Sequence, residues 1–345
     1  MNPAAQTPDS SRTDAPPVDP HRWLRRQGRW TIFETVFWLA ALVPFFLFPT
    51  YLTLASQIAI AALFAISVDL VLGYAGIITL GHAMFFGLGA YCAGLISKAG
   101  WGEPFSGLLI SGLFAALVGY AVSFMIVRVR HLALIMITLG IGLLTLELAN
   151  SMTWLTGGAD GLQGVDIDPL FGRFEFDLWG YTAYSYALVV LFAGILVMRR
   201  IVHSAFGLSL RGVRENLTRM PAIGSSYLGR LQVVYTISAG MAGIAGALLT
   251  QTTETVSLDT LSFQRSADVV VMLILGGTGR LYGGIIGAII FMVARDQLSG
   301  VNPQYWYFWI GLLLMAIVLL LPNGIVGGLS RLLAWIRARI SEREA

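Results

Sequence analysis

Ionisable residues inside long apolar stretches are the first candidates for chemistry in this sequence. They are Asp69, His82, Glu147, Asp268, Arg295 and Asp296. A charged side chain at the centre of a bilayer costs about 2.5 kcal/mol or more, so each of these residues needs a partner or a water-filled cavity. They could line a polar substrate path, relay protons or pair between helices, and Arg295 could pair directly with Asp296. The sequence leaves these alternatives open.

Motifs for soluble enzyme chemistry are missing. A phosphate-binding loop requires the pattern G-x-x-x-x-G-K-[ST], but the single lysine, Lys98, is followed by Ala99. The sequence contains no H-E-x-x-H or paired-cysteine arrangement, and no serine has an acid and a histidine at useful spacing. We therefore expect no catalytic residue, no metal and no cofactor, and any ATP hydrolysis must occur on another chain.

The composition indicates a membrane protein. Of the 345 residues, 56% are hydrophobic and 12% are charged, whereas soluble domains carry roughly 25% charged residues. Apolar stretches approach the length of about 20 residues that a spanning helix needs. They cover residues 31–49, 51–72, 80–97, 105–127, 132–155, 181–198, 231–251, 264–276, 281–298 and 305–322. The predicted fold class is an all-α polytopic membrane protein of about ten transmembrane helices.

Charge in the loops predicts the orientation. Arginines gather in segments 22–29, 128–131, 199–230 and 331–339, whereas loop 157–180 contains five acidic residues and one arginine. The positive-inside rule places the arginine-rich segments and both termini in the cytoplasm. We expect a disordered and interfacial tail over residues 1–30, a transmembrane domain over 31–325, and an amphipathic tail on the membrane lipid over 326–345.

Two glycine-containing runs interrupt the apolar stretches at corresponding places. Residues 70–76 read LVLGYAG and residues 273–279 read LILGGTG. Paired interruptions are typical of internally duplicated transporters whose broken helices line a pathway, although close packing of helices through small residues is an alternative. We predict glycine-broken segments, an internal duplication and a translocation pathway. The pathway residues expected are Asp69, Gly73, Tyr74, Gly76, Thr79, His82, Glu147, Gly276 and Gly279.

The loop over residues 199–230 contains a short amphipathic segment. Residues 208–220 predict a helix in which Leu210, Val213 and Leu217 share one face, with Pro221 and Gly224 ending it. Such a helix could dock into a groove on another protein or rest on anionic lipid.

Five stretches together resemble the permease subunits of branched-chain amino-acid ABC importers, specifically the Liv-type M permeases. They are GYAGIITLGHAMFFGLGAY (73–91), TGGADGL (156–162), FG (206–207) with REN (214–216), AGMAGIAGA (239–247), and GGTG (276–279) leading to LPNGIVG (321–327). They extend over most of the membrane part. The chain departs from the family pattern at Asp69 and at Met220-Pro221.

The resemblance implies a permease subunit of the bacterial inner membrane that pairs with a second Liv-type permease and two cytoplasmic ATPases. A periplasmic binding protein would deliver branched-chain or other hydrophobic amino acids, and no nucleic acid is involved. Urea, short amides and small aromatic acids are alternative substrates within the family. The loop helix would then be the coupling helix on the ATPase, and Arg214→Glu would prevent ATPase association. Its expected coupling residues are Arg211, Arg214, Glu215, Asn216, Arg219 and Gly224.

Two other classes of transport protein remain as alternatives. A proton-coupled secondary transporter would use Asp69, His82, Glu147 or Asp268 as titrating groups. A channel would need no energy coupling and would not accumulate solute against a gradient.

Overall fold

The computed structural model describes residues 32–129, 131–177, 179–217, 219–222, 224, 226–321 and 324–328. All regular elements in these residues are helices, with two isolated β-bridges, Leu162–Val256 and Leu170–Phe174. The expected tail over 1–30 and nearly all of the expected tail over 326–345 lie outside the described residues.

Helices occupy every stretch in which the sequence predicts a span. The helical elements, including those between the spans, are α2 (Ile32–Ala40), α3 (Val43–Leu47), η1 (Pro49–Tyr51), α4 (Leu52–Asp69) with its π-helical end η2 (Leu70–Tyr74), α5 (Ala83–Lys98), α6 (Pro104–Ile126), α7 (His131–Ser151), α8 (Thr153–Thr156), η3 (Gly158–Asp160), α9 (Tyr181–Val202), α10 (Ala205–Glu215), α11 (Arg219–Ala222), α12 (Leu228–Thr253), η4 (Leu258–Leu261), α13 (Phe263–Gly276), α14 (Gly283–Val301) and α15 (Trp306–Leu320).

Six of the described helical segments are long and apolar enough to cross a membrane. They are Pro49–Tyr74, Pro104–Ile126, His131–Ser151, Tyr181–Val202, Leu228–Thr253 and Gly283–Val301, and shorter apolar helices cover Ile32–Leu47, Ala83–Lys98 and Trp306–Ile317. The all-helical, multi-pass class is therefore confirmed, and the number ten stays a prediction.

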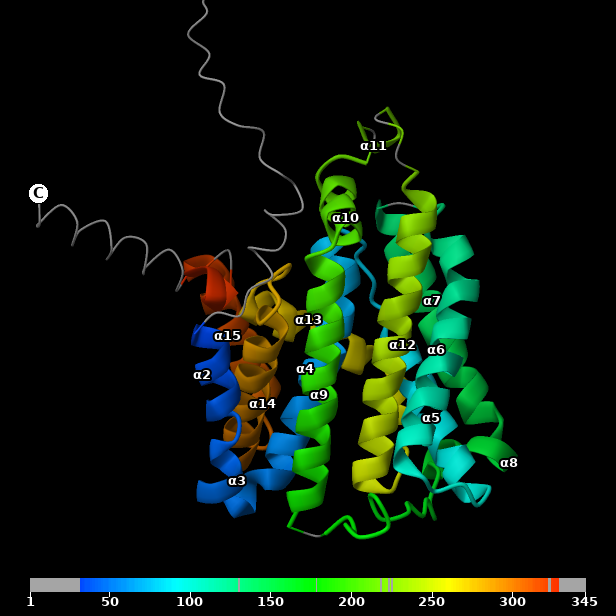
Figure 1. The fold of residues 1–345 in the computed structure, drawn as a ribbon, viewed down its shortest axis with the longest axis vertical. Coiled ribbons are helices and arrows are strands. Elements are labelled where there is room, and N and C mark those ends of the chain that lie inside the picture. The colour runs from blue at the N-terminus through cyan, green and yellow to red at the C-terminus, as the bar shows by residue number, and fades with distance from the viewer. Residues whose placement is uncertain are drawn as a thin grey trace, which may run out of the picture.

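The helix α12 lies among α4, α5 and α6 (Figure 1), and small residues let these backbones approach closely. A Cβ on Gly246 of α12 would lie 1.8 Å from the carbonyl oxygen of Phe86, and one on Gly89 of α5 would lie 2.1 Å from that of Gly243. Helices in lipid gain stability from such close van der Waals packing, because burial of apolar surface drives association only in water. The same glycines position α5 within the bundle.

Two helices, α5 and α13, have only 16 and 14 residues, and each follows an irregular segment. Residues 75–82 lead into α5 and residues 254–262 lead into α13. The starts of the two helices meet, because the Ala83 N–H donates to Ser266 Oγ at 2.9 Å. This pair of interrupted segments supports the expected internal duplication, which remains a prediction.

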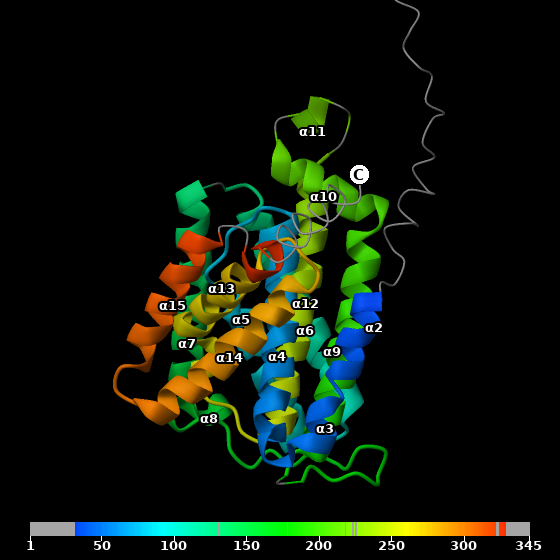
Figure 2. The ribbon, with the colours of Figure 1, turned by 90° about the vertical axis from the view of Figure 1, so that its left-hand side faces the viewer.

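The two charged loop regions lie at opposite ends of the helices (Figures 1 and 2). Helices α10 and α11 extend from one end, and the acid-rich loop 157–180 crosses the other. That loop is tied to the start of α6 and the end of α5, because Asp168 N–H donates to Gly102 O at 3.0 Å and the Ser97 hydroxyl donates to Asp166 O. The opposed positions agree with the charge pattern of the sequence.

The helix expected over residues 208–220 is placed differently by the structure. Ser204 caps α10 by accepting a hydrogen bond from Gly207 N–H at 3.3 Å, and the helix already ends at Glu215. Asn216 is extended, and its Oδ1 accepts from Arg219 N–H at 3.1 Å, which starts α11. Pro221 lies within this first turn, where its missing N–H leaves no helical bond unmade. The expected end at Pro221 is therefore wrong, and Asn216 makes the break instead.

Candidate functional site

The two glycine runs that match in sequence lie in contact at the end of α4. The Gly279 N–H donates to Asp69 Oδ1 at 2.8 Å. A Cβ on Gly73 would lie 2.1 Å from Asp69 Oδ1 and 2.4 Å from Gly279 N, so only glycine fits there. We call Asp69, Gly73, Gly279 and the attached Arg214 the glycine junction. It joins the end of α4 to the segment between α13 and α14.

The helix α10 is attached to this junction through two arginines. Arg214 Nη1 donates to the carbonyl oxygen of Gly73, and the Arg211 guanidinium lies 5.4 Å from the centre of the Tyr74 ring. Arg214 also packs over Gly76, whose φ of +74° favours glycine. The Gly73 carbonyl belongs to the π-helical turn η2, and such turns are frequent at functional sites. A displacement of α10 would therefore act directly on the end of α4.

Burial fixes α10 in this position. Leu210 is fully buried and Val213 nearly so, as expected of the apolar face predicted from the sequence. Asp69, the acceptor inside the junction, is 2% exposed. A buried carboxylate needs hydrogen bonds, and the Gly279 amide supplies one of them. The junction is thus a packed polar contact between three segments that are distant in the chain.

The other expected pathway residues lie elsewhere. His82 is completely buried between α5 and α12, and its Nε2 is 2.8 Å from Ser238 Oγ. Thr79 lies in the same core and accepts a bond from Gly81 N–H at 3.4 Å. Glu147 is on the exposed face of α7, and Gly276 packs on the Gly283 carbonyl. The structure therefore gathers Asp69, Gly73, Tyr74, Gly76 and Gly279 at one place and leaves these four apart.

The remaining expected coupling residues form the outward side of the same region. Glu215, Arg219 and Gly224 are exposed on α10, on α11 and in the turn that follows. Gly224 has a φ of +79°, so this turn favours glycine. Asn216 orients α11 through its cap, and Met220 packs under α11 against Gly212. The guanidinium groups of Arg211 and Arg214 thus contact the end of α4, although Arg214 is also exposed. The exposed residues Glu215, Arg219 and Gly224 can face a partner.

A cavity of about 340 Å³ is lined by α4, α5, α12, α13 and α14. Its polar lining includes Gln57, Arg265, Asp268, Arg295 and Asp296. It extends from Gln57 and Ser299 toward Phe64 in the middle of α4. The start of α4 lies beside Gly180, so the cavity occupies the half of the molecule that carries loop 157–180.

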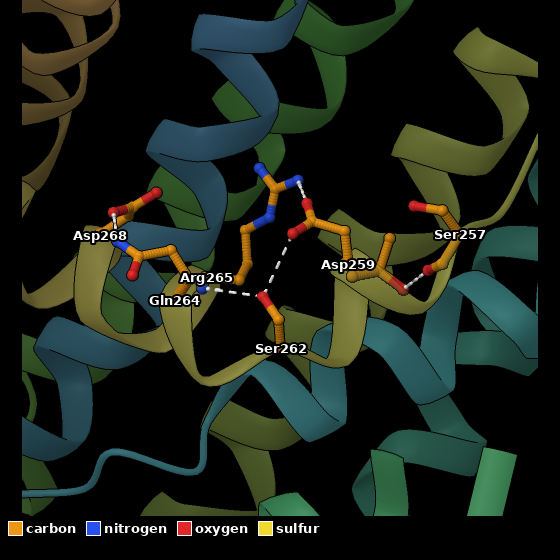
Figure 3. A network of polar contacts seen from close by, with 7 residues as sticks. Ser257, Asp259, Ser262, Gln264, Arg265 and Asp268 are labelled. Carbon is orange, nitrogen blue, oxygen red and sulfur yellow. Dashed lines mark hydrogen bonds and ion pairs between the residues drawn. The ribbon is translucent and has the colours of Figure 1, made fainter. Parts of the chain in front are cut away.

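Figure 3 shows how the start of α13 holds two of the charges in the cavity wall. Ser262 caps the helix by accepting from Arg265 N–H at 3.2 Å. Arg265 Nη2 donates to Asp259 Oδ2 at 2.6 Å, and Gln264 Nε2 donates to Asp268 Oδ1 at 2.8 Å. Both charged side chains are therefore positioned by neighbours on the same segment.

Arg265 is a residue that the sequence reasoning missed, because it stands at the edge of an apolar stretch. A direct pair of Arg295 with Asp296, one of the alternatives that the sequence leaves open, is not formed among the described residues. Adjacent helical residues do not face each other, and the Arg295 guanidinium instead lies 5.2 Å from the centre of the Trp306 ring. Within the described residues, no group of three or more His, Cys, Asp and Glu side chains could hold a metal ion.

The packed bundle of apolar helices, its interrupted segments and its attached surface helix define a multi-pass membrane permease. A family model described as "branched-chain amino acid transport system / permease component" matches residues 50–318. The chain belongs to this family of permease components.

Individual relatives agree with this assignment. The chain is 27% identical over 323 residues to the high-affinity branched-chain amino acid transport system permease protein LivM of Escherichia coli K12, covering 86% of this chain and 76% of that protein. It is 26% identical over 285 residues to LivH of the same strain, covering 77% and 91%. A probable LivM of Methanocaldococcus jannaschii is 23% identical over 314 residues, covering 76% and 89%. No solved structure matches the chain.

Proposed function

We propose that this chain is one of two permease subunits in an inner-membrane ABC importer for branched-chain or other hydrophobic amino acids. The partners are a second Liv-type permease, two cytoplasmic ATPases and a periplasmic binding protein. The names of LivM and LivH describe both as permease proteins of the high-affinity branched-chain amino acid transport system. The similarity of the chain to both of them supports a pair of related subunits. The observation that carries the proposal is the attachment of α10 to the glycine junction by Arg214.

Force would pass through the junction in one short path. A partner ATPase that contacts the exposed side of α10 and α11 moves α10 when it closes on ATP. Arg214 transmits the displacement to the Gly73 carbonyl, and Asp69 transmits it to the Gly279 amide. Because the junction contains glycines with no side chains between the backbones, the end of α4 and the turn after α13 can slide as two close surfaces. The chain thus acts as a gate that another subunit drives.

The orientation follows from the same contact. If α10 and α11 receive an ATPase, their end of the molecule is cytoplasmic, and loop 157–180 faces the periplasm. This agrees with the arginines in segment 199–230 and the acidic residues in the loop. Both termini are cytoplasmic in this proposal, and the binding protein docks on the loop side.

Substrate competition tests the proposed function directly. Cells that express the chain together with the proposed second permease, ATPases and binding protein are supplied with radiolabelled L-leucine, and unlabelled isoleucine, urea, acetamide or benzoate is added in excess. We expect isoleucine to compete and the other three compounds to leave uptake unchanged. Competition by urea, acetamide or benzoate alone would assign the importer to another substrate class of the family.

Asp69 separates the ABC importer from the proton-coupled alternative. We expect Asp69→Asn to retain most of the uptake, because an amide oxygen can still accept the bond from Gly279 N–H. Asp69→Leu should reduce uptake strongly, since an unsatisfied buried amide costs about 1–3 kcal/mol. If Asp69 carried protons, Asp69→Asn would lose leucine uptake, because an amide cannot take up and release a proton in place of the carboxyl group. The measurement is the initial rate of leucine uptake, with Glu175→Gln in the exposed loop 157–180 as the control.

A further inference from the structure

The cavity lined by α4, α5, α12, α13 and α14 carries four charged side chains in a part of the molecule that crosses the membrane. Arg265 and Asp268 come from the first turns of α13, and Arg295 and Asp296 come from α14, a helix of membrane-spanning length. Charges in spanning helices are retained where they face water, a partner or a ligand. These four side chains line one cavity.

The charges of the cavity are only partly neutralised by the protein. Asp259 already pairs with Arg265 at 2.6 Å. Among the described residues, no carboxylate lies within ion-pair distance of Arg295, and no cation lies within that distance of Asp296. Asp268 is within electrostatic range of Arg295 and accepts a bond from Gln264. A cationic group and two carboxylates are thus available at the wall of one cavity.

The deeper wall of the same cavity is apolar. Phe64 and Phe86 pack with their ring centres 4.7 Å apart, and Ile60, Met272 and Met292 line the cavity beside them. A volume of about 340 Å³ is at the small end of the range for ligand pockets, roughly 300–1,000 Å³. The cavity therefore suits a small molecule with one charged end and one apolar end.

We infer that this cavity is a binding site for the zwitterionic head and aliphatic side chain of an α-amino acid during its passage. Arg295 receives the carboxylate, and Asp296 and Asp268 receive the ammonium group. The side chain of the amino acid lies against Phe64, Phe86 and Met272. This inference rests on the proposed function and adds where on this chain the substrate is held. It also gives a physical reason for rejecting urea, which has no charge, and small aromatic acids, which have no cation.

Arginine suits this role better than lysine. Its planar guanidinium can donate two parallel hydrogen bonds to one carboxylate, and Arg295 is among the residues that line the cavity. Carboxylates at Asp296 and Asp268 complement an ammonium group, which has three donors. Both halves of the zwitterion thus find a group of opposite charge.

Binding to the purified full-length chain in lipid nanodiscs tests the inference without any partner subunit. The probes are L-leucine, 4-methylpentanoate, which lacks the ammonium group, and 3-methylbutylamine, which lacks the carboxylate. Saturation-transfer NMR reports contact of each probe with the protein at millimolar concentration. We expect leucine to bind. Either analogue should bind at least about tenfold more weakly than leucine, because each lacks one hydrogen-bonded charge contact.

Variants then locate the site. Arg295→Gln and Asp296→Asn should each weaken leucine binding by about tenfold or more, and Arg295→Lys should fall between Arg295→Gln and the wild type. The matched control is Arg173→Gln, which removes the same charge from the exposed loop and should bind leucine normally. Equal elution volumes in size-exclusion chromatography verify the fold of each variant.

Three results would overturn the inference: no leucine binding by the wild-type chain, equal binding of the analogues, or unchanged binding in both cavity variants. The leucine-uptake assay of the proposed function is independent of this result. Uptake by wild-type cells together with unchanged binding in the variants would reject the cavity site and leave the importer standing. If leucine bound at the cavity but the assembled transporter did not take it up, the cavity site would stand and the proposed importer function would be rejected.

Discussion

Gly73→Ala should abolish leucine uptake and lower the free energy of unfolding by about 3 kcal/mol or more. A Cβ at this position would lie 2.1 Å from Asp69 Oδ1 and 2.4 Å from the Gly279 amide nitrogen. Overpacking of a tight site usually costs about 1–3 kcal/mol, and here one of the two obstructing atoms is backbone, which cannot rotate away. The contact between the two glycine runs would have to open, and the bond between Gly279 and Asp69 would be lost. The measurements are thermal unfolding in detergent and the initial rate of uptake.

The matched control for this substitution is Gly140→Ala in α7. The space around Gly140 is open, with no heavy atom within 4 Å of a Cβ placed there. Alanine is a better helix former than glycine by about 1 kcal/mol, so this variant should be neutral or slightly more stable, with normal uptake. Normal uptake by Gly73→Ala would show that the glycine junction does not have to stay closely packed for transport.

Arg214→Glu should reduce leucine uptake by more than about tenfold while the ATPase subunits still bind and hydrolyse ATP. The substitution removes the donor to Gly73 O and brings a second carboxylate toward Asp69. A lost bond to a charged donor costs about 1.5–3 kcal/mol, and repulsion between the two acids adds to it. The sequence alone suggested that this variant would lose the ATPase, but the structure places the guanidinium against the membrane helices. We therefore expect an uncoupled transporter.

Arg219→Glu provides the contrast. Arg219 is exposed on α11, and only its backbone amide takes part in the cap with Asn216. If the exposed side of α10 and α11 receives the ATPase, this variant should weaken co-purification of the ATPase. Measurements of co-purification, ATP hydrolysis and uptake distinguish the two phenotypes. The assignment of Arg214 to force transmission would be rejected if its variant lost the ATPase and Arg219→Glu did not.

Most of the fold could be predicted because each feature depends on local sequence. Apolar stretches correspond to helices wherever they were expected, and the arginine-rich and acid-rich loops lie at opposite ends. The two runs LVLGYAG and LILGGTG were paired by their pattern, and the structure brings Gly73 of one against Gly279 of the other. The two runs could be matched because closely packed backbones require a residue without a side chain, whatever the surrounding sequence.

The parts that could not be predicted depend on which helix faces meet. His82 and Asp69 both stand in apolar stretches of the sequence. Only the structure shows that Ser238 of the distant helix α12 holds His82 in the core. Arg295 and Asp296 are adjacent in sequence but do not pair, and their common cavity is completed by Phe64 of α4 and Met272 of α13. The break at Asn216 depends on one side chain capping the next turn. Hydrophobic periodicity contains no information on these contacts.

The central claim is that this permease is moved by nucleotide hydrolysis on a partner subunit. The most direct measurement is leucine accumulation in right-side-out membrane vesicles that contain the whole transporter, with ATP held constant while the proton gradient is collapsed. We predict that accumulation continues under these conditions and stops when ATP is removed. Uphill accumulation of leucine by the purified chain alone in liposomes, driven only by an ion gradient, would contradict the claim.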